Sequence, residues 1–599
     1  MKTMLRAAAF AGSAALLAVA FGVSASAQGQ QALVIQNGTL IDGNGGEPVD
    51  NAVVVVQGNQ IVAAGPADQI DVPAGAEIID AEGKWVLPGL WDGQASYSWF
   101  FGELFLHHGV TSQIDIGLGA EVSAAARNAV NMGLQRGPRE WIGIAHFGGF
   151  DEDELHGYET PYDGRQLPRT FETLQTHTRM LLDRGADMIM FHDGDWDPQW
   201  VSWACDEAHA AGKPCTQRAG GPRMGIREAA LAGVDIVHHS RGVGPAVVAD
   251  GIDANNALDQ FANMDEGKAL NLVDLIVREE IYLVPNIIHE APGYPADWPL
   301  MQAAYHDLFS DPELLAYYPE GFQKRLARTR RDTAMGELRE RRMPGYHNMI
   351  RFHKMVIDAG GKVLIGGDTN GAKVPGSIIH EEMAIFQEGG VAPMQIIMGA
   401  TKWPAEAMRV ADRIGTVEAG KLADIIIVGA DPLADINNLR QIDSVIFNGR
   451  VIDHGMHASY SVPFHGYDGD QRYTINDGHW VAALKEFTGP VRPRDTAPDP
   501  DTSPQPAIEA IAPTAIKKGS PATTLELTGL NFVAGTRVLI DGISVPWQWV
   551  DGTKINVMLD QNLLNQAGRR EIVVRNPEPL GTGMWGDGTS NSAFLLVEY

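Results

Sequence analysis

The chain has few cysteines, a shortage of basic residues and no long apolar run beyond its first residues. Cys205 and Cys215 are the only cysteines among 599 residues, which excludes a disulfide-rich scaffold but leaves open one bridge or two buried thiols. The 46 Lys and Arg residues are outnumbered by 75 Asp and Glu residues, which gives a formal net charge of −29. This balance argues against a nucleic acid or an anionic membrane surface as partner.

The first residues have the pattern of an export signal. Lys2 and Arg6 precede an apolar stretch, and Ala25, Ser26 and Ala27 form an A-x-A cleavage site before Gln28. We therefore expect residues 1–27 to be a signal peptide and the mature protein to be exported, to the periplasm or the extracellular space. No later apolar run approaches the roughly 18 residues that a membrane-spanning helix needs, so we expect no membrane span after cleavage.

The pattern of apolar and turn residues changes several times along the chain, which indicates more than one domain. Residues 32–84 and 406–453 carry short Val- and Ile-rich runs separated by turn residues, and we expect them to form one composite β-domain. Between them, strand candidates such as ADMIMFHD, VDIVHHS and KVLIGGD alternate with helical stretches. This α/β alternation over residues 85–405 predicts a (β/α)8 TIM-like barrel, whose site lies at the carboxyl ends of its strands.

The remainder of the chain divides into two further segments. Residues 454–505 are rich in Gly, Asp and Pro and end in RPRDTAPDPDTSPQP, so we interpret them as a linker. Residues 506–599 show short alternating strands, among them TTLELTG, KINVMLD and AFLLVEY, which predict an immunoglobulin-like β-sandwich.

A family resemblance rests on many segments in a fixed order. LVIQNGTLIDGNGG, GKWVLPGLWD, AGVDIVHHS, LIGGDT and RIGTVEAGKLADIIIV resemble the amidohydrolase superfamily, in particular its secreted imidazolonepropionase-like and prolidase-like members. The resemblance covers about residues 32–453. The C-terminal segment resembles an IPT/TIG domain in its opening, PAIEAIAPTAIKKGS, and in its close, SNSAFLLVEY. A domain of that kind implies contact with a protein or a glycan and no catalysis.

The resemblance implies a metal site that this sequence has largely lost. Members usually carry two histidines on strand 1, a carboxylated lysine on strand 4, histidines on strands 5 and 6 and an aspartate on strand 8. At these places the chain has, in order, Gln94 and Ser96, Met190, Arg218, His239 and Asp368. An arginine cannot ligate a cation and adds positive charge, so we expect a degenerate site without the usual binuclear metal.

Two interpretations of the altered site remain open. In the first, no cofactor is bound: His239 is a general base, Asp368 orients it and Arg218 stabilises an oxyanion. The residues expected to contact the substrate are then Gln94, Ser96, His192 and His289. In the second, a single divalent ion such as Zn²⁺ is held by His192, His239 and Asp368. For His192 and His289, a surface or loop role is the competing interpretation.

The expected function is that of an atypical amidohydrolase. We expect hydrolysis of a C–N bond, or related acid–base chemistry, in a small substrate that is aromatic or an amide. Aromatic residues are dense in two places, which favours a largely apolar ligand. They are Tyr97, Trp99, Phe100 and Phe101, and again Tyr294, Trp298, Tyr317 and Tyr318. The alternatives are a metal-free lyase or isomerase on the same scaffold, and a retired enzyme that serves as an extracellular binding protein.

Overall fold

The computed structural model describes residues 31–598, with gaps. The residues outside the description are 97–100, 117–125, 128–129, 132–134, 149–153, 156–166, 184, 193–194, 222, 297, 311–322, 325–336, 371–372, 458–502, 504–505, 578–587 and 591. The expected signal peptide and most of the expected linker lie outside the described residues, as do Tyr97, Trp99, Phe100, Tyr317 and Tyr318.

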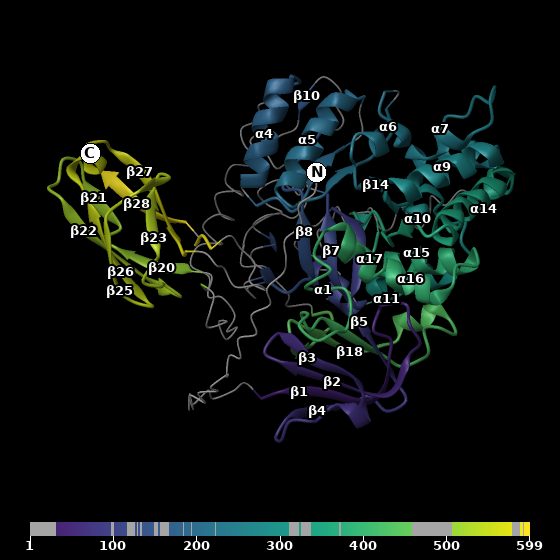
Figure 1. Ribbon diagram of the computed structural model, residues 1–599, viewed down its shortest axis with the longest axis horizontal. Helices are drawn as coiled ribbons and strands as arrows, with labels where there is room; N and C mark the ends of the chain where they lie inside the picture. The colour runs from purple at the N-terminus through teal and green to yellow at the C-terminus, as the bar shows by residue number, and fades with distance from the viewer. Residues whose placement is uncertain are drawn as a thin grey trace, which may run out of the picture.

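One sheet joins strands from both flanks of the barrel segment. β1 (Leu33–Leu40) pairs with β2 (Val49–Gln57) on one side and with β5 (Trp85–Pro88) on the other, and β5 pairs with β17 (Ile425–Val428). The sheet is completed by β3 (Gln60–Pro66), β4 (Glu77–Asp80), β18 (Ile442–Phe447) and β19 (Arg450–Ile452). Strand residues that alternate inward, such as Ile35, Val54 and Ile425, share one apolar core. The two distant segments therefore form one structural unit (Figure 1).

The central part is a closed ring of parallel strands. Its strands are β6 (Leu90–Ala95), β7 (Val110–Asp115), β8 (Arg139–Ile142), β9 (His146–Phe147), β12 (Ile189–Phe191), β13 (Cys215–Gln217), β14 (Ile236–His238), β15 (Tyr282–Val284) and β16 (Lys362–Val363). Neighbours pair in the orders β6-β7-β8 and β9-β12-β13-β14-β15-β16. A parallel bridge between Ala95 and Thr369 joins the segment after β16 to β6 and closes the ring. All carboxyl ends therefore lie at one end of the barrel.

Helices cover the outside of this ring (Figure 1). The longer ones are α4 (Phe171–Asp183), α5 (Pro198–Ala210), α9 (Glu266–Arg278), α11 (Trp298–Ser310), α14 (Glu337–Asp358) and α15 (Ser377–Glu388). The shorter ones are α1 (Gly102–His107), α6 (Ile226–Leu231), α7 (Gly244–Val247), α8 (Ala257–Ala262), α10 (Ile287–Glu290), α16 (Pro393–Gly399) and α17 (Lys402–Ala407). In α9, Ala269, Leu272 and Ile276 recur at helical spacing and are buried, which seats the helix on the barrel. Within the described part of the chain, no helix has the length and apolarity needed to cross a membrane.

The C-terminal residues form two further sheets with a core of their own. One sheet contains β20 (Ala507–Ala512), β22 (Thr523–Leu530), β26 (Lys554–Leu559) and β25 (Trp547–Asp551). The other contains β21 (Ala515–Lys517), β28 (Ala593–Glu598), β27 (Gly568–Arg575), β23 (Arg537–Ile540) and β24 (Ile543–Ser544). Leu525 and Leu527 alternate inward on β22 and join Val538 and Ile572 in one apolar cluster. This core involves residues from 508 to 597 alone.

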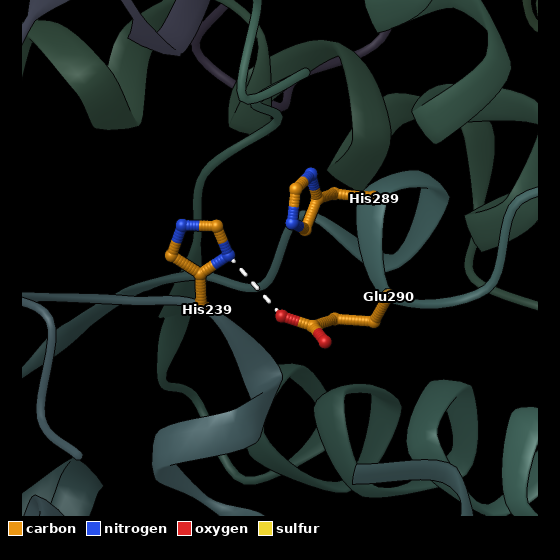
Figure 2. A group of neighbouring side chains, drawn as sticks. All are labelled: His239, His289 and Glu290. Atoms are coloured by element: carbon orange, nitrogen blue, oxygen red, sulfur yellow. Dashed lines mark ion pairs between the residues drawn. The ribbon is translucent and has the colours of Figure 1, made fainter. Parts of the chain in front are cut away.

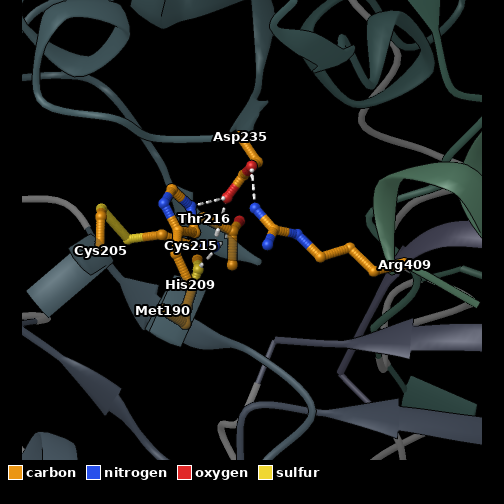
Figure 3. The surroundings of a disulfide bond; sticks show 7 residues. All are labelled: Met190, Cys205, His209, Cys215, Thr216, Asp235 and Arg409. Atoms are coloured by element: carbon orange, nitrogen blue, oxygen red, sulfur yellow. Dashed lines mark hydrogen bonds and ion pairs between the residues drawn. A yellow bond between two sulfur atoms is a disulfide. The ribbon is translucent and has the colours of Figure 1, made fainter. Parts of the chain in front are cut away.

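The two cysteines are joined. Cys205 in α5 and Cys215 at the start of β13 form a disulfide, and both residues are fully buried. Asp235 reinforces the same place, because it accepts hydrogen bonds from the Cys215 backbone N–H (2.7 Å) and from Arg409 (2.9 Å) and contacts His209 (Figure 3). The bridge thus fastens the helix that precedes β13 to the strand that leads into Arg218.

Candidate functional site

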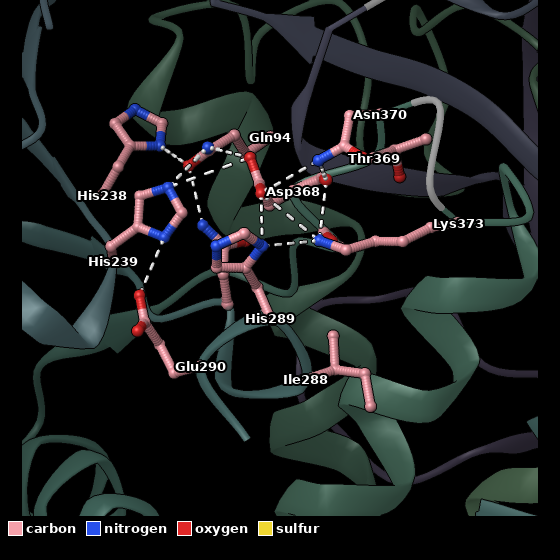
Figure 4. A network of polar contacts seen from close by, with 12 residues as sticks. Gln94, His238, His239, Ile288, His289, Glu290, Asp368, Thr369, Asn370 and Lys373 are labelled. Atoms are coloured by element: carbon pink, nitrogen blue, oxygen red, sulfur yellow. Dashed lines mark hydrogen bonds and ion pairs between the residues drawn. The ribbon is translucent and has the colours of Figure 1, made fainter. Parts of the chain in front are cut away.

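A cluster of polar side chains occupies the carboxyl end of the barrel. Gln94 lies near the end of β6, His238 is the last residue of β14, and Asp368 follows β16. His289 and Glu290 come from α10, the short helix after β15. Figure 4 shows that these side chains point toward one another. Four of the predicted site residues, Gln94, His239, His289 and Asp368, therefore lie in one cluster, and their roles stay predictions.

Gln94 is the centre of this cluster and is completely buried. Its Nε2 lies 2.8 Å from Asp368 Oδ1 and 2.9 Å from His239 Nε2. Its Oε1 lies 2.7 Å from His238 Nδ1 and accepts a 2.7 Å hydrogen bond from Asn286 Nδ2. The amide must have this orientation, because the reverse would set its oxygen against the Asp368 carboxylate.

The orientation of the Gln94 amide fixes the proton positions on two histidines. Nε2 of Gln94 only donates, so His239 Nε2 accepts and His239 carries its proton on Nδ1, which faces Glu290 Oε1 at 3.2 Å (Figure 2). Oε1 of Gln94 only accepts, so His238 carries its proton on Nδ1. Burial lowers the pKa of His238 to about 3 and the pKa of His239 well below its usual value, so both rings are neutral.

The two adjacent histidines, His238 and His239, contact the same residue, Gln94. Strand alternation would place them on opposite faces. His239, however, lies just beyond the end of β14 with a positive φ of 69°, so the backbone turns and brings its ring to Gln94 beside His238. His238 also contacts Thr216 Oγ1 at 2.6 Å. Sequence reasoning missed His238 because it assumed that the strand continued.

Asp368 pairs directly with His289 and not with His239. His289 Nδ1 lies 2.7 Å from Asp368 Oδ2, whereas His239 Nε2 lies 3.8 Å from Asp368 Oδ1 with the Gln94 amide bonded to both. The predicted His239–Asp368 pair is therefore replaced by a His289–Asp368 pair. Lys373 Nζ also lies 3.0 Å from His289 Nδ1. The ionised Asp368 carboxylate can only accept, so a hydrogen bond from His289 to Asp368 requires the proton on Nδ1 and leaves Nε2 as the acceptor. The His289 side chain is 33% exposed.

Lys373 holds Asp368 in its ionised state. Its ammonium donates to the carbonyl oxygens of Gly367 and Asp368, at 2.8 Å each, and to Asp368 Oδ2 at 3.3 Å. Burial by itself would raise the pKa of Asp368, but Lys373 and His289 outweigh it and hold this pKa well below its usual value. Lys373 was not predicted from the sequence, where no motif marks it.

A buried glutamate holds the helix that carries His289 and Glu290. Glu382 in α15 accepts hydrogen bonds from the backbone N–H groups of Ile287 and Ile288, both at 2.8 Å. These are the first N–H groups of α10, which have no partner within the helix. Burial raises the pKa of Glu382 to about 8. Neither Glu382 nor Glu290 was predicted; the adjacency of Glu290 to His289 in PNIIHE is the one signal that could have found the latter.

Arg218 and His192 form a separate pair at the same end of the barrel. Arg218 follows β13, His192 follows β12, and an Arg218 guanidinium nitrogen lies 2.5 Å from His192 Nε2. Burial, and then the neighbouring His146 and Arg218, lower the pKa of His192 to about 2. Arg218 also lowers the pKa of His239, so its charge is felt inside the cluster. Arg218 was predicted to act together with His239 and Asp368. It contacts His192 and not Asp368, so these residues come together only in part.

Ser96 meets the cluster through its backbone. Its N–H donates to the Thr369 carbonyl (2.8 Å), which helps to close the ring next to Asp368. Asp92 strengthens the same junction, because it accepts hydrogen bonds from the backbone N–H groups of Gly367 (3.0 Å) and Gln94 (3.1 Å). Burial raises the pKa of Asp92 to about 6. The expected role of Ser96 in substrate binding stays a prediction.

The residues present do not fit the binuclear metal centre that the resemblance implies. Met190 on β12 stands in the lysine's place, with its sulfur 3.6 Å from Thr216 Oγ1. Gln94 turns an amide N–H₂, which cannot ligate, toward His239 and Asp368. The guanidinium of Arg218 adds a fixed positive charge. No bridging or terminal ligand set for two ions remains at these positions.

The residues present do not suit a site for a single divalent ion either. Among the residues that the structure describes, one group brings three ligand-type atoms within 4.8 Å of one another, namely His239, His289 and Glu290. The predicted set of His192, His239 and Asp368 is not such a group. An ion at the former group would meet the proton that Gln94 fixes on His239 Nδ1, and Arg241, whose Nε lies 3.5 Å from Glu290 Oε1. The charge and the hydrogen-bond directions both oppose a cation there.

Comparisons with known proteins agree with the fold. Residues 315–452 match the model of the Amidohydrolase family. A Xaa-Pro dipeptidase with bound methionine superposes with a TM-score of 0.51 and 21% identity over 71% of this chain and 100% of its own. An A. niger ochratoxinase superposes with a TM-score of 0.51 and 19% identity over 72% of this chain and 99% of its own. A molinate hydrolase gives 0.50 and 20% over 71% and 95%.

No curated protein sequence matches this chain significantly. The family model matches part of the barrel segment and the following sheet strands, and the structural likenesses show the fold, a TIM-like barrel with an accompanying sheet domain.

Proposed function

We propose that this protein is an exported hydrolase that cleaves a C–N bond in a small amide substrate without the usual binuclear metal centre. The observation that carries the proposal is the His289–Asp368 pair, with Nδ1 and Oδ2 2.7 Å apart, Lys373 beside the carboxylate and a His289 side chain that is 33% exposed. The superfamily match and neighbours named as a dipeptidase, an ochratoxinase and a molinate hydrolase support hydrolysis of amide-type bonds.

The pair supplies general base and general acid catalysis at one atom. His289 Nε2 accepts a proton from water while the water oxygen forms a bond to the carbonyl carbon. Asp368 stabilises the resulting imidazolium, as a carboxylate does in a catalytic triad. His289 then donates the proton to the leaving nitrogen, the C–N bond breaks, and an acid and an amine are released. Arg218 provides the positive charge for the oxyanion.

The first experiment measures turnover of a panel of N-acyl amino acids and dipeptides by the mature protein in the presence of chelator. We expect His289→Gln and Asp368→Asn each to reduce kcat by roughly 10²- to 10⁴-fold, the range of general base catalysis. His347→Gln, at an exposed position of α14, is the matched control and should leave kcat unchanged. Full activity of His289→Gln, or no turnover of any amide, would refute the proposal.

The alternative chemistries give different products. A hydrolase incorporates one oxygen from ¹⁸O-labelled water into the released acid, whereas a lyase or isomerase on the same pair of residues does not. A binding protein without activity releases no product at all. Mass spectrometry of the products therefore separates these functions.

The C-terminal unit has a separate role in this proposal. None of its described residues belongs to the cluster at the barrel end, and its β-sheets share a core of their own. We assign it contact with a protein or a glycan outside the cell, as the IPT/TIG resemblance implies.

A further inference from the structure

A buried serine–histidine pair lies next to the candidate site. Ser240 follows His239 and begins the 3₁₀ helix η3 (Ser240–Gly242), whereas His353 lies in α14, and both side chains are fully buried. Ser240 Oγ lies 3.0 Å from His353 Nε2 and donates a 3.1 Å hydrogen bond to the carbonyl oxygen of Pro285. The Ser240 backbone N–H donates to the same oxygen at 2.9 Å. One serine therefore ties the end of β14 to the end of β15 and to a helix outside the ring.

The hydrogen-bond directions separate this pair from a nucleophile with its base. A hydroxyl has one proton and the Pro285 carbonyl can only accept, so the Ser240 proton is used at Pro285. Both contacts are then hydrogen bonds only if His353 Nε2 donates to Ser240 Oγ. Burial lowers the pKa of His353 to about 3, so the ring is neutral. A base that activated the serine would have to accept at Nε2, so the pair holds geometry and performs no chemistry.

The pair lies between two turns that need support from outside. His239 has φ 69° and ψ 135°, a combination that residues other than glycine rarely adopt. Asn286, which follows Pro285, is left-handed with φ 50°. Such backbone conformations persist only where surrounding contacts hold them. The two hydrogen bonds from Ser240 to Pro285 join one turn to the other, and His353 fixes the hydroxyl that makes one of them.

Both turns deliver side chains to the cluster. His239 Nε2 lies 2.9 Å from Gln94 Nε2, and Asn286 Nδ2 donates to Gln94 Oε1 at 2.7 Å. Asn286 is also the residue directly before α10, the helix that carries His289. A shift of this turn therefore moves the start of α10, and with it the ring of the proposed general base.

We propose that Ser240 and His353 are positioning residues for the hydrolysis assigned above, and that they hold the turns after β14 and β15 so that α10 presents His289 to Asp368. The inference rests on the proposed function, because it names the contacts that orient the proposed base. Neither residue is catalytic, since their hydrogen bonds run to each other and to the backbone. Loss of the pair displaces the base, and a displacement of about 1 Å costs roughly 100-fold in rate.

Hydrogen exchange in α10 tests this role without a substrate. The backbone N–H groups of residues 287–289 are all hydrogen-bonded, so their exchange reports opening of the helix. In the mature protein at pH 7, we expect exchange about tenfold or more faster in Ser240→Ala and in His353→Met, measured by mass spectrometry. His353→Gln keeps an N–H donor at the same distance along the side chain and should restore slow exchange.

His380→Met is the matched control. His380 in α15 is another buried histidine whose Nε2 contacts a backbone carbonyl, that of His108 at 2.9 Å, and burial also lowers its pKa to about 3. The substitution removes a comparable hydrogen bond away from both turns. Exchange at residues 287–289 and kcat should therefore stay as in the unmodified protein.

Turnover of an amide from the panel above measures the effect on catalysis. We expect Ser240→Ala and His353→Met each to lower kcat by about ten- to a hundredfold with KM changed less than about threefold, and His353→Gln to recover most of kcat. Unchanged exchange in both Ser240→Ala and His353→Met, or an unchanged kcat, would overturn the inference. If exchange rises as expected but the unmodified protein hydrolyses no amide, the proposed hydrolase function fails while the hold of the pair on the two turns stands.

Discussion

At the scale of single residues, the site depends on one neutral side chain. Gln94 stands where the resemblance expects a metal-binding histidine, and it satisfies His238, His239, Asn286 and Asp368 at once. A side chain with both donors and an acceptor can fix a network of this kind, whereas a carboxylate of the same length has no donor.

Replacing Gln94 by glutamate tests this role. Gln94→Glu removes two N–H donors and places a buried negative charge beside Asp368 Oδ1, which now lies 2.8 Å from the amide nitrogen. We expect the free energy of unfolding to fall by roughly 2–4 kcal/mol at pH 7 and to recover in part at pH 5, because one carboxyl of the pair takes up a proton.

Urea unfolding at both pH values measures the effect. Gln94→Met, of similar size and without charge, is the control and should lose stability to the same extent at both pH values. A Gln94→Glu protein as stable as the original at pH 7 would contradict the assigned network.

The sequence predicted where the site residues lie better than it predicted which of them form hydrogen bonds with one another. Strand patterning and the family resemblance were enough to place Gln94, His239 and Asp368 at the strand ends. The pairings were missed because His239 and Asp368 have positive φ values of 69° and 45°, so their side chains leave the strand in directions that alternation does not predict. Lys373 and Glu382 come from segments without a recognisable motif, and only the fold brings them to the site.

At the scale of elements, α10 is the least conventional part of the site. It spans only Ile287–Glu290, follows Asn286 in a left-handed conformation, and is capped by Glu382 from a different helix. A helix this short has little stability of its own, so tertiary contacts must hold it in place.

The cap predicts a pH-dependent stability. Glu382 has its pKa raised from 4.5 to about 8, so the folded protein holds a proton that the unfolded chain releases between these pH values. The contribution of this group to the free energy of unfolding therefore falls as pH rises from 4.5 to 8, by at most about 1.4 kcal/mol per pH unit. The side chain at position 382 of the Glu382→Gln variant cannot titrate. We expect the free energy of unfolding of this variant to be below that of the original protein near pH 5, and the difference between the two proteins to shrink or reverse near pH 8.

Chemical denaturation from pH 5 to pH 8 gives the free energy of unfolding of both proteins. The difference between these two free energies reports Glu382 alone, because the other groups titrate equally in both proteins. Parallel stability curves would show that Glu382 does not carry the proton assigned to it.

At the scale of the whole molecule, residue patterns along the sequence anticipate several of the sheets that the structure describes. Alternating strands and helices predicted the barrel, and Val- and Ile-rich runs on both flanks predicted strands that the structure joins in one sheet. The separate C-terminal core follows from period-two patterning such as that of Leu525 and Leu527. Closure of the barrel through Thr369 could not be seen in this way, because it depends on contacts between residues far apart in the chain.

The domain arrangement makes a prediction for limited proteolysis. We expect cleavage within residues 490–506 and release of a stable C-terminal fragment, because the segment is rich in Pro and Asp and the fragment beyond it has its own core. Mass spectrometry of the fragments gives the cleavage sites. First cleavage inside β20 to β28, with the barrel part intact, would argue against an independently stable unit.

The central claim is that hydrogen bonds of Gln94 and the charges of Arg218, Arg241 and Lys373 occupy the place of the metal centre. The most direct test is the metal content of the mature protein after incubation with excess Zn²⁺ and removal of unbound ions, determined by elemental analysis. The account predicts far less than one zinc per chain, with no difference between the original protein and His239→Gln. One or two equivalents of zinc that remain bound, and are lost in His239→Gln, would contradict it.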